Sequence, residues 1–141
     1  MNDSMNMSSR VRLGIDDGQR TLTDLLNGPM IRFNEKPDGV LGTTGIYLVY
    51  EGNEPVYAGS TNNLRRRIFT QLFSGRNHYF ATQMIEQRFH DLEKFQHYLI
   101  SQCSVQSLTI DTEDHAHWLE RYVIGVIRPV YNGGKRAYSK A

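Results

Sequence analysis

The sequence contains a single cysteine and no long apolar run. The one thiol, Cys103, cannot form a disulfide within the chain or supply a multi-thiolate zinc or iron–sulfur site. No segment approaches the roughly 18 apolar residues of a membrane span, and the polar residues 1–10 lack the apolar core of a secretory signal. These absences argue against a disulfide scaffold and a membrane protein, and we expect a soluble protein of the reducing, cytoplasmic compartment.

Charge of one sign is not in excess either, since the formal net charge is +1. The charges are nevertheless segregated. Residues 57–90 contain five arginines and one glutamate, residues 111–120 contain four carboxylates and no lysine or arginine, and residues 121–141 contain five basic residues and no carboxylate. A basic surface beside a few carboxylates suits an enzyme that acts on a polyanion through a divalent cation, although such blocks are equally typical of solvated faces.

The apolar content is sufficient for one hydrophobic core, because 39% of the 141 residues are hydrophobic and 11% are aromatic. Periodicity and turn signals give an element order of β-β-α-α-β-α. The ranges are 45–50 and 56–59 for an antiparallel hairpin, 64–73 and 78–90 for helices, 95–100 for a third strand, and Thr112 to before Pro129 for a final helix. We predict an α/β (α+β) fold with a small three-stranded, mixed or antiparallel sheet flanked by helices.

Glu120 is the most informative residue of the final predicted helix. At 100° per residue it falls between Ala116 and Ile124, in apolar surroundings. A buried carboxylate without a partner costs several kcal/mol. We therefore expect an arginine or a metal ion beside Glu120, or a glutamate that extends to solvent. The apolar face of this helix is predicted to hold Trp118, Leu119, Tyr122, Val123 and Val126.

Several separated residues agree in order and spacing with a known enzyme family. Gly45-Ile46-Tyr47 is followed after nine residues by Tyr57-Ala58-Gly59, and Arg67 lies ten residues after the second tyrosine. Glu120 precedes Asn132, the last residue of the segment RPVYN, by twelve residues. This pattern resembles the GIY-YIG nuclease superfamily, above all the catalytic domains of phage-type homing endonucleases and of the excision-repair incision nuclease, with Ala58 in place of the usual isoleucine or valine.

The resemblance extends to a histidine and includes two departures. The stretch LFSGRNHYFATQMI is similar to the phage homing endonuclease branch, in which a histidine follows a glycine after the first helix, so His78 is the matching residue. Gln71 replaces a second histidine of some members, and Ser60 replaces a lysine that often follows the YIG glycine. These departures leave open which residue is the general base.

The resemblance implies a division of the chain into three parts. Residues 1–44 are expected to form an N-terminal extension, residues 45–132 the nuclease domain, and residues 133–141 a basic C-terminal tail. Within the extension we expect a frayed start over residues 1–10, a short helix over Thr21–Leu26, and a short strand or extended piece over Met30–Phe33.

Phosphodiester hydrolysis needs an activated water and stabilisation of charge on the phosphoryl and leaving oxygens. A hard divalent cation such as Mg²⁺ (or Mn²⁺) can perform much of this with one protein carboxylate and several waters. Glu120 is the carboxylate that we nominate as metal ligand. The guanidinium of Arg67 can donate two hydrogen bonds to phosphoryl oxygens in the transition state.

The resemblance implies roles for four further residues. The hydroxyls of Tyr47 and Tyr57 would orient the nucleophilic water, and one of them would accept its proton. His78 could act as the base or bind phosphate, and Asn132 would support the site through hydrogen bonds. Without the resemblance, we would interpret both tyrosines as strand aromatics packed in the sheet, and His78 as a helix cap or a surface residue.

DNA is the expected partner. Arginine and lysine side chains around the site are candidates for contacts with the phosphate backbone, which give affinity without sequence information; they are Arg65, Arg66, Arg76, Arg88, Lys135, Arg136 and Lys140. We find no separate DNA-recognition module, and cleavage of both strands would favour a homodimer or sequential nicking. The alternatives to a stand-alone, metal-dependent endonuclease are a nucleic-acid-binding module with the same fold but no catalysis, and an interaction domain unrelated to nucleic acid.

Overall fold

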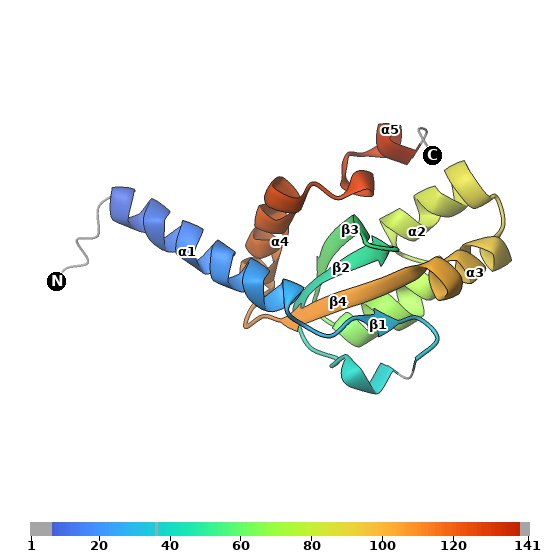
Figure 1. The fold of residues 1–141 in the computed structure, drawn as a ribbon, viewed down its shortest axis with the longest axis horizontal. Helices are drawn as coiled ribbons and strands as arrows, with labels where there is room; N and C mark the ends of the chain where they lie inside the picture. The colour runs from blue at the N-terminus through green and yellow to red at the C-terminus, as the bar shows by residue number, and fades with distance from the viewer. Residues whose placement is uncertain (1–6, 36, 139–141) are drawn as a thin grey trace.

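The structure is a computed structural model that describes residues 7–35 and 37–138, apart from the side chains of Pro37 and Lys135. Figure 1 shows the elements in chain order. They are α1 (Met7–Leu26), β1 (Ile31–Arg32), β2 (Gly45–Glu51), β3 (Glu54–Thr61), a π-helical segment (Arg66–Leu72), α2 (Tyr79–Met84), a second π-helical segment (Ile85–Phe89), α3 (Leu92–Gln102), β4 (Cys103–Thr109), α4 (Glu113–Ile127) and α5 (Lys135–Tyr138).

The described elements form one antiparallel sheet in the order β1-β4-β2-β3. The predicted hairpin is confirmed as β2 and β3, which pair along their whole lengths with a bulge between Val49 and Tyr50. The expectation of three strands is wrong by one, because the extended piece after residue 30 pairs with β4 as the short strand β1. The hairpin lies at one side of the sheet, so that β3 is an edge strand.

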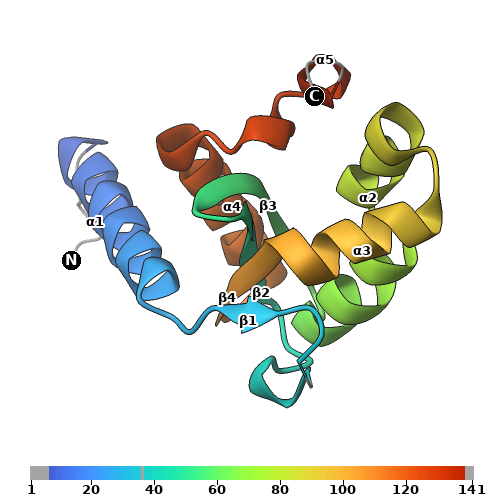
Figure 2. The same cartoon turned by 45° about the vertical axis from the view of Figure 1, so that its right-hand side comes forward.

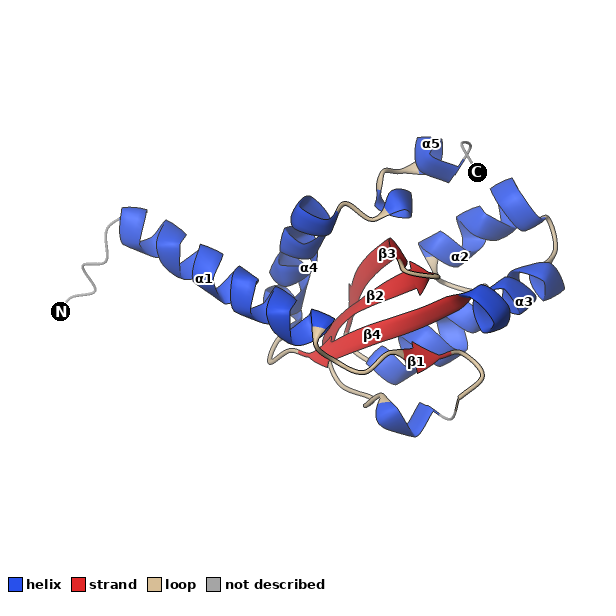
Figure 3. Cartoon of the chain, in the orientation of Figure 1, coloured by secondary structure: helices blue, strands red, loops and turns tan. Residues whose placement is uncertain are grey.

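Helices cover both faces of the sheet, as the turned view in Figure 2 and the colours of Figure 3 make clear. Side chains alternate along a strand, so Tyr47 and Val49 belong to the core beneath α2 and α3, whereas Ile46 and Leu48 belong to the core beneath α1 and α4. The alternation continues on the edge strand from Tyr57, which packs against the first core, to Ala58, which belongs to the second.

The strand predicted over residues 95–100 is wrong, because these residues lie in α3. Phe95, Tyr98 and Leu99 follow helical spacing and are buried, and the side chain of Asp91 accepts a hydrogen bond from the Lys94 amide to cap the helix. The third long strand follows directly as β4, where burial is continuous over residues 103–106.

The N-terminal helix is longer than expected. The segment predicted over Thr21–Leu26 is only the end of α1, and the expected fraying is wrong for residues 7–10, which are helical; residues 1–6 lie outside the described residues. The final helix is confirmed, with the Thr112 hydroxyl accepting from the His115 amide at its start and the helix ending before Pro129. Within the described ranges, no helix has the length and apolar character needed to cross a membrane.

Candidate active site

Tyr47 and Tyr57 lie on the same face of the hairpin. Tyr47 is paired with Gly59 across the strands, and Tyr57 stands two residues before Gly59, so the two rings are diagonal neighbours with centroids 6.4 Å apart. The glycine is required, because a Cβ atom at position 59 would lie 2.5 Å from the Tyr47 hydroxyl. Gly59 thus lets the Tyr47 ring extend across the edge strand toward the site.

His78 contacts the Tyr47 hydroxyl from the adjacent helical layer. The distance from Tyr47 Oη to His78 Nε2 is 2.8 Å, and both side chains are buried. His78 also caps α2, since its Nδ1 accepts a hydrogen bond from the Ala81 amide. An imidazole that accepts at Nδ1 carries its proton at Nε2, so we infer that His78 donates to Tyr47. Burial, helped by the charge of Arg67, lowers the pKa of His78 to about 3 and keeps the ring neutral.

Arg67 projects from the π-helical segment Arg66–Leu72, a geometry that is frequent at functional sites. Its Nη1 donates to Gln71 Oε1 at 3.1 Å and to the Asn77 carbonyl. The guanidinium is therefore fixed at Nη1, while its buried Nε is left without a hydrogen-bond partner among the described residues.

The two tyrosines experience opposing fields. Burial is the main cause that raises the pKa of each, and Tyr57 adds to the effect at Tyr47. The Glu120 carboxylate raises both values further, whereas the Arg67 guanidinium lowers both. Glu120 and Arg67 thus shift the pKa values of the same two hydroxyls in opposite directions.

Glu120 reaches this edge from α4 and binds a residue of β3. Its Oε1 accepts a hydrogen bond of 2.5 Å from the Ser60 hydroxyl, and His117 Nδ1 lies 3.8 Å from the same oxygen. The side chain is 20% exposed, so the Ser60 hydroxyl and partial exposure account for a carboxylate on this helix, and no arginine among the described residues forms an ion pair with it. The position of Ser60 beside Glu120 was not predicted from the sequence, where it stood out only as the residue after the YAG tripeptide.

Asn132 acts on the backbone of the edge strand. Its Oδ1 accepts from the Ala58 amide at 2.8 Å, and its Nδ2 donates to the Ala58 carbonyl at 2.9 Å. This pair of hydrogen bonds replaces the missing neighbour strand at the outer side of β3. Asn132 thereby fixes the backbone between Tyr57 and Gly59, and does not lie free in the site.

The donor set suits a hard cation that keeps most of its water ligands. No group of three or more His, Cys, Asp or Glu side chains in the described ranges could hold a metal ion as an all-protein cage. One carboxylate with neighbouring hydroxyl oxygens is the arrangement expected for Mg²⁺. A surface hollow of about 290 Å³ opens beside Ser60 and holds polar and acidic groups that suit a hydrated cation; it is lined by Ser60, Thr61, Asn62, Glu113, Asp114 and His117.

The predicted DNA-contact residues are not all equivalent. Arg65 donates to the Val40 carbonyl and Arg66 to Asn62, while both remain exposed. Arg76 is also exposed. Arg88 is held by Glu51 at 3.2 Å and by the Tyr131 hydroxyl, and its guanidinium lies over the Phe89 and Tyr98 rings.

The structure therefore gives Arg88 a packing role, because its guanidinium is held by Glu51, Tyr131 and two aromatic rings. Arg136 is exposed on α5, and the Lys135 side chain and Lys140 lie outside the described residues.

Comparisons with known proteins identify the family of the chain. The model of the GIY-YIG catalytic domain family matches residues 43–132, whereas a comparison with curated proteins gives no match. Among solved structures, the chain is similar to the GIY-YIG N-terminal endonuclease domain of UvrC from Thermotoga maritima. A point mutant bound to its catalytic divalent cation shares 15% identity over 79% of this chain and 92% of that chain, with a TM-score of 0.43. The magnesium-bound form shares 14% over 79% and 93%, with a TM-score of 0.39.

Proposed function

Since the chain belongs to the GIY-YIG family, we propose that it is an endonuclease that hydrolyses phosphodiester bonds of DNA with the help of Mg²⁺ or Mn²⁺. The observation that carries the proposal is the meeting of two helical layers at the β3 edge. Tyr47 and His78 come from one layer, and Glu120 comes from the other. Arg67 acts on the same tyrosines.

In the proposed mechanism the Tyr47 phenol first releases its own proton to solvent, and the resulting phenolate takes the proton of the attacking water. Burial raises the pKa of the phenol and so disfavours the phenolate, which forms only when neighbouring donors stabilise it. The His78 Nε2 proton and the charge of Arg67 supply that stabilisation. His78 is thus a positioning residue, because a ring with a pKa of about 3 is too weak a base for the water itself.

Arg67 and Glu120 serve the phosphate. The guanidinium of Arg67 donates to a phosphoryl oxygen and offsets the charge that builds there. Glu120 would hold the cation through its carboxylate, which Ser60 positions by a hydrogen bond. When bound, the cation polarises the phosphoryl and leaving oxygens and lowers the pKa of bound water. Tyr57, on which the charges of Glu120 and Arg67 also act, orients the water through its hydroxyl.

The affinity for DNA comes in this proposal from exposed arginines near the site. Arg66 and Arg76 lie on the surface next to the Arg67 segment, where their charges can pair with phosphates. Arg65 contributes its exposed charge in the same way. Arg136 and Lys135, on α5, would extend this contact.

A cleavage assay tests the function directly. We expect wild-type protein to cut DNA with Mg²⁺ or Mn²⁺ and not with a chelator, on at least one of single-stranded, duplex and branched substrates. Glu120→Gln should abolish cleavage and keep DNA binding, because it removes the metal ligand and no phosphate contact. Glu93→Gln, on the exposed first turn of α3, is the matched control and should cut normally.

Two outcomes would contradict the proposal. Cleavage by Glu120→Gln at the wild-type rate would remove Glu120 from the metal site. Binding of every substrate without cleavage by the wild type would favour the alternative, a nucleic-acid-binding module that retains the nuclease fold.

A further inference from the structure

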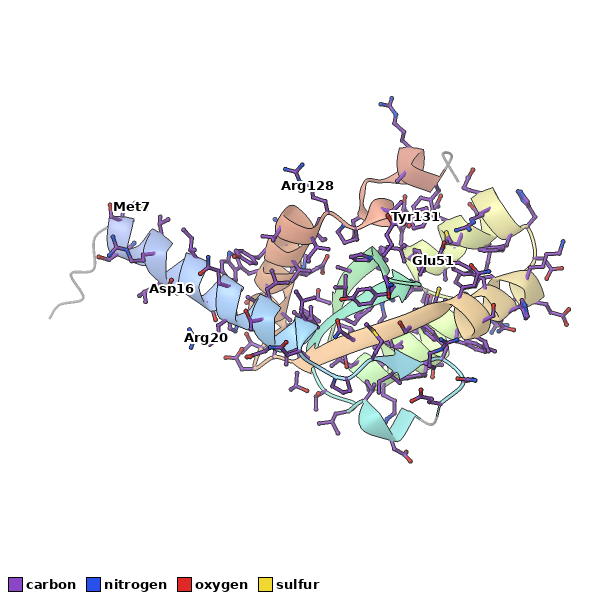
Figure 4. The ribbon with its side chains drawn as sticks, viewed as in Figure 1. Met7, Asp16, Arg20, Glu51, Arg128 and Tyr131 are labelled. Carbon is purple, nitrogen blue, oxygen red and sulfur yellow. The ribbon has the colours of Figure 1, made fainter. Side chains whose placement is uncertain are left out.

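The outer half of α1 carries an apolar face that the described part of the chain leaves uncovered. Figure 1 shows the helix extending away from the sheet, and Figure 4 shows Met7 at its outer end. Met7, Val11 and Ile15 are 70%, 53% and 47% exposed. They recur every four residues and so lie on one side of the helix. The inner half behaves differently, because Gly18, Thr21 and Leu25 are buried against the domain.

The apolar side continues onto α4. The Trp118 ring is 42% exposed and lies beside Gly14, and Tyr122 packs against Gly18, where a Cβ atom would come within 2.6 Å of its ring. A surface hollow of about 370 Å³ separates the two helices and is lined by Arg10, Val11, Gly14, Ile15, Trp118 and Tyr122. We call Met7, Val11, Ile15 and Trp118 the α1 stripe.

Charges beside the stripe are arranged in a self-complementary order. Arg12 and Asp16 are one helical turn apart, on the side of the stripe that faces away from α4, and both are exposed. Neither has an ion-pair or hydrogen-bond partner among the described residues. On the other side, Asp17 is already bound to His115 at 2.8 Å. Along α1, the basic residue Arg12 therefore lies nearer the outer end of the helix, and the acidic residue Asp16 lies nearer the domain.

We propose that the α1 stripe binds a second copy of this chain, with the two α1 helices antiparallel about a twofold axis at the level of residues 13 and 14. In that arrangement Val11 and Ile15 of one copy face the partner's Ile15 and Val11. Arg12 faces the partner's Asp16, and the same contact recurs by symmetry. A parallel arrangement would instead place like charges together.

The observations favour this occupant over nucleic acid. The stripe is apolar and flanked by as many acidic as basic groups, whereas a phosphate backbone selects a basic surface. One helical face and one tryptophan form a contact near or below the roughly 1,200 Å² of a standard interface. We therefore expect a dimer that dissociates on dilution.

The consequence for activity rests on the proposed function. A single active site cuts one strand at a time, and a twofold dimer presents two sites to a duplex. The test below measures mass, so its result does not depend on whether the protein cleaves DNA.

The test is sedimentation or light-scattering mass over a concentration series of the full chain. Wild type should rise from the 16.3 kDa monomer toward twice that mass. Ile15→Glu should weaken association by about 100-fold, because the charge enters the interface twice. Leu13→Glu is the matched control: Leu13 is 52% exposed on the opposite side of the same helix, and its variant should associate like wild type.

A charge exchange makes the test independent of the apolar change. Arg12→Glu and Asp16→Arg should each weaken self-association, and an equimolar mixture of the two variants should recover it, because both contacts become attractive again. A wild-type chain that stays monomeric at every concentration would overturn the proposal. Equal weakening of self-association by Ile15→Glu and Leu13→Glu would also overturn it. So would loss of DNA binding by Ile15→Glu with an unchanged mass.

Discussion

Asn132→Ala distinguishes a residue that holds the edge strand from one that reacts with substrate. The amide of Asn132 makes two hydrogen bonds with the Ala58 backbone, and Ala58 itself is 1% exposed. Each intramolecular hydrogen bond contributes about 0.5–1.5 kcal/mol net, so removal of both should lower the free energy of unfolding by about 1–3 kcal/mol. A residue that contacted only the substrate would leave the free energy of unfolding unchanged.

Urea unfolding at equilibrium measures this difference. The midpoint should fall at an unchanged slope, since the change weakens the native state without altering the surface exposed on unfolding. Asn132→Asp is the graded control. It keeps an acceptor for the Ala58 amide and loses the donor to the Ala58 carbonyl, so its unfolding free energy should lie between those of the wild type and Asn132→Ala.

Cleavage by the same variants completes the argument. Ala58 lies between Tyr57 and Gly59, so a displaced β3 backbone would move both the Tyr57 hydroxyl and the surface beneath Tyr47. We expect the rate to fall together with stability across the two variants. A wild-type unfolding midpoint for Asn132→Ala, with activity lost, would refute a backbone role and make Asn132 a catalytic residue.

Two further predictions concern the same face of the sheet. Gly59→Ala should reduce cleavage by about 100-fold, the cost of a displacement of roughly 1 Å in a positioned group, because its Cβ would force Tyr47 away. Gly125→Ala, where the space is open, is the control that should cut normally. The pKa of His78 is about 3 against about 6.5 in the unfolded chain, so the unfolded state binds the extra proton as the pH falls. Stability should therefore decline by up to about 1.4 kcal/mol per pH unit from about pH 6.5 down to pH 3. His78→Asn should lack this decline, and a parallel pH profile of the two proteins would show that His78 is not buried as a neutral ring.

Local signals made part of the fold predictable. The hairpin follows from two β-branched runs around turn residues, and the bounds of α4 follow from Thr112 and Pro129, which act within one helical turn. The segment FQHYLI was misleading because its residues favour strands, yet the helix cap at Asp91 and the i, i+3, i+4 burial of Phe95, Tyr98 and Leu99 determine its state. Tertiary burial outweighed propensity there.

Contacts across the sheet account for what the sequence could not provide. The apolar side of α4 was predicted to include Trp118 and Val126, but they are 42% and 54% exposed, because α4 buries Ala116, Leu119 and Val123 against the sheet. The rotation of a helix about its own axis determines which of its residues face the sheet, and periodicity alone does not fix that rotation. The same rotation brings Glu120 to Ser60, which lies sixty residues earlier in the chain.

The edge position of β3 explains why the site needs residues so far apart in sequence. An edge strand has no neighbouring strand on one side, and its side chains point alternately to the two faces of the sheet. Asn132 satisfies the unpaired side at Ala58, while Tyr57 points to one face and Ser60 to the other. A central strand would have a neighbour where Asn132 lies, and its helical layers would be separated by that neighbour. Glu120 hydrogen-bonds Ser60 on one face of β3, while Arg67 lowers the pKa of Tyr57 on the other face, so the edge strand allows helices on opposite faces of the sheet to contribute to one site.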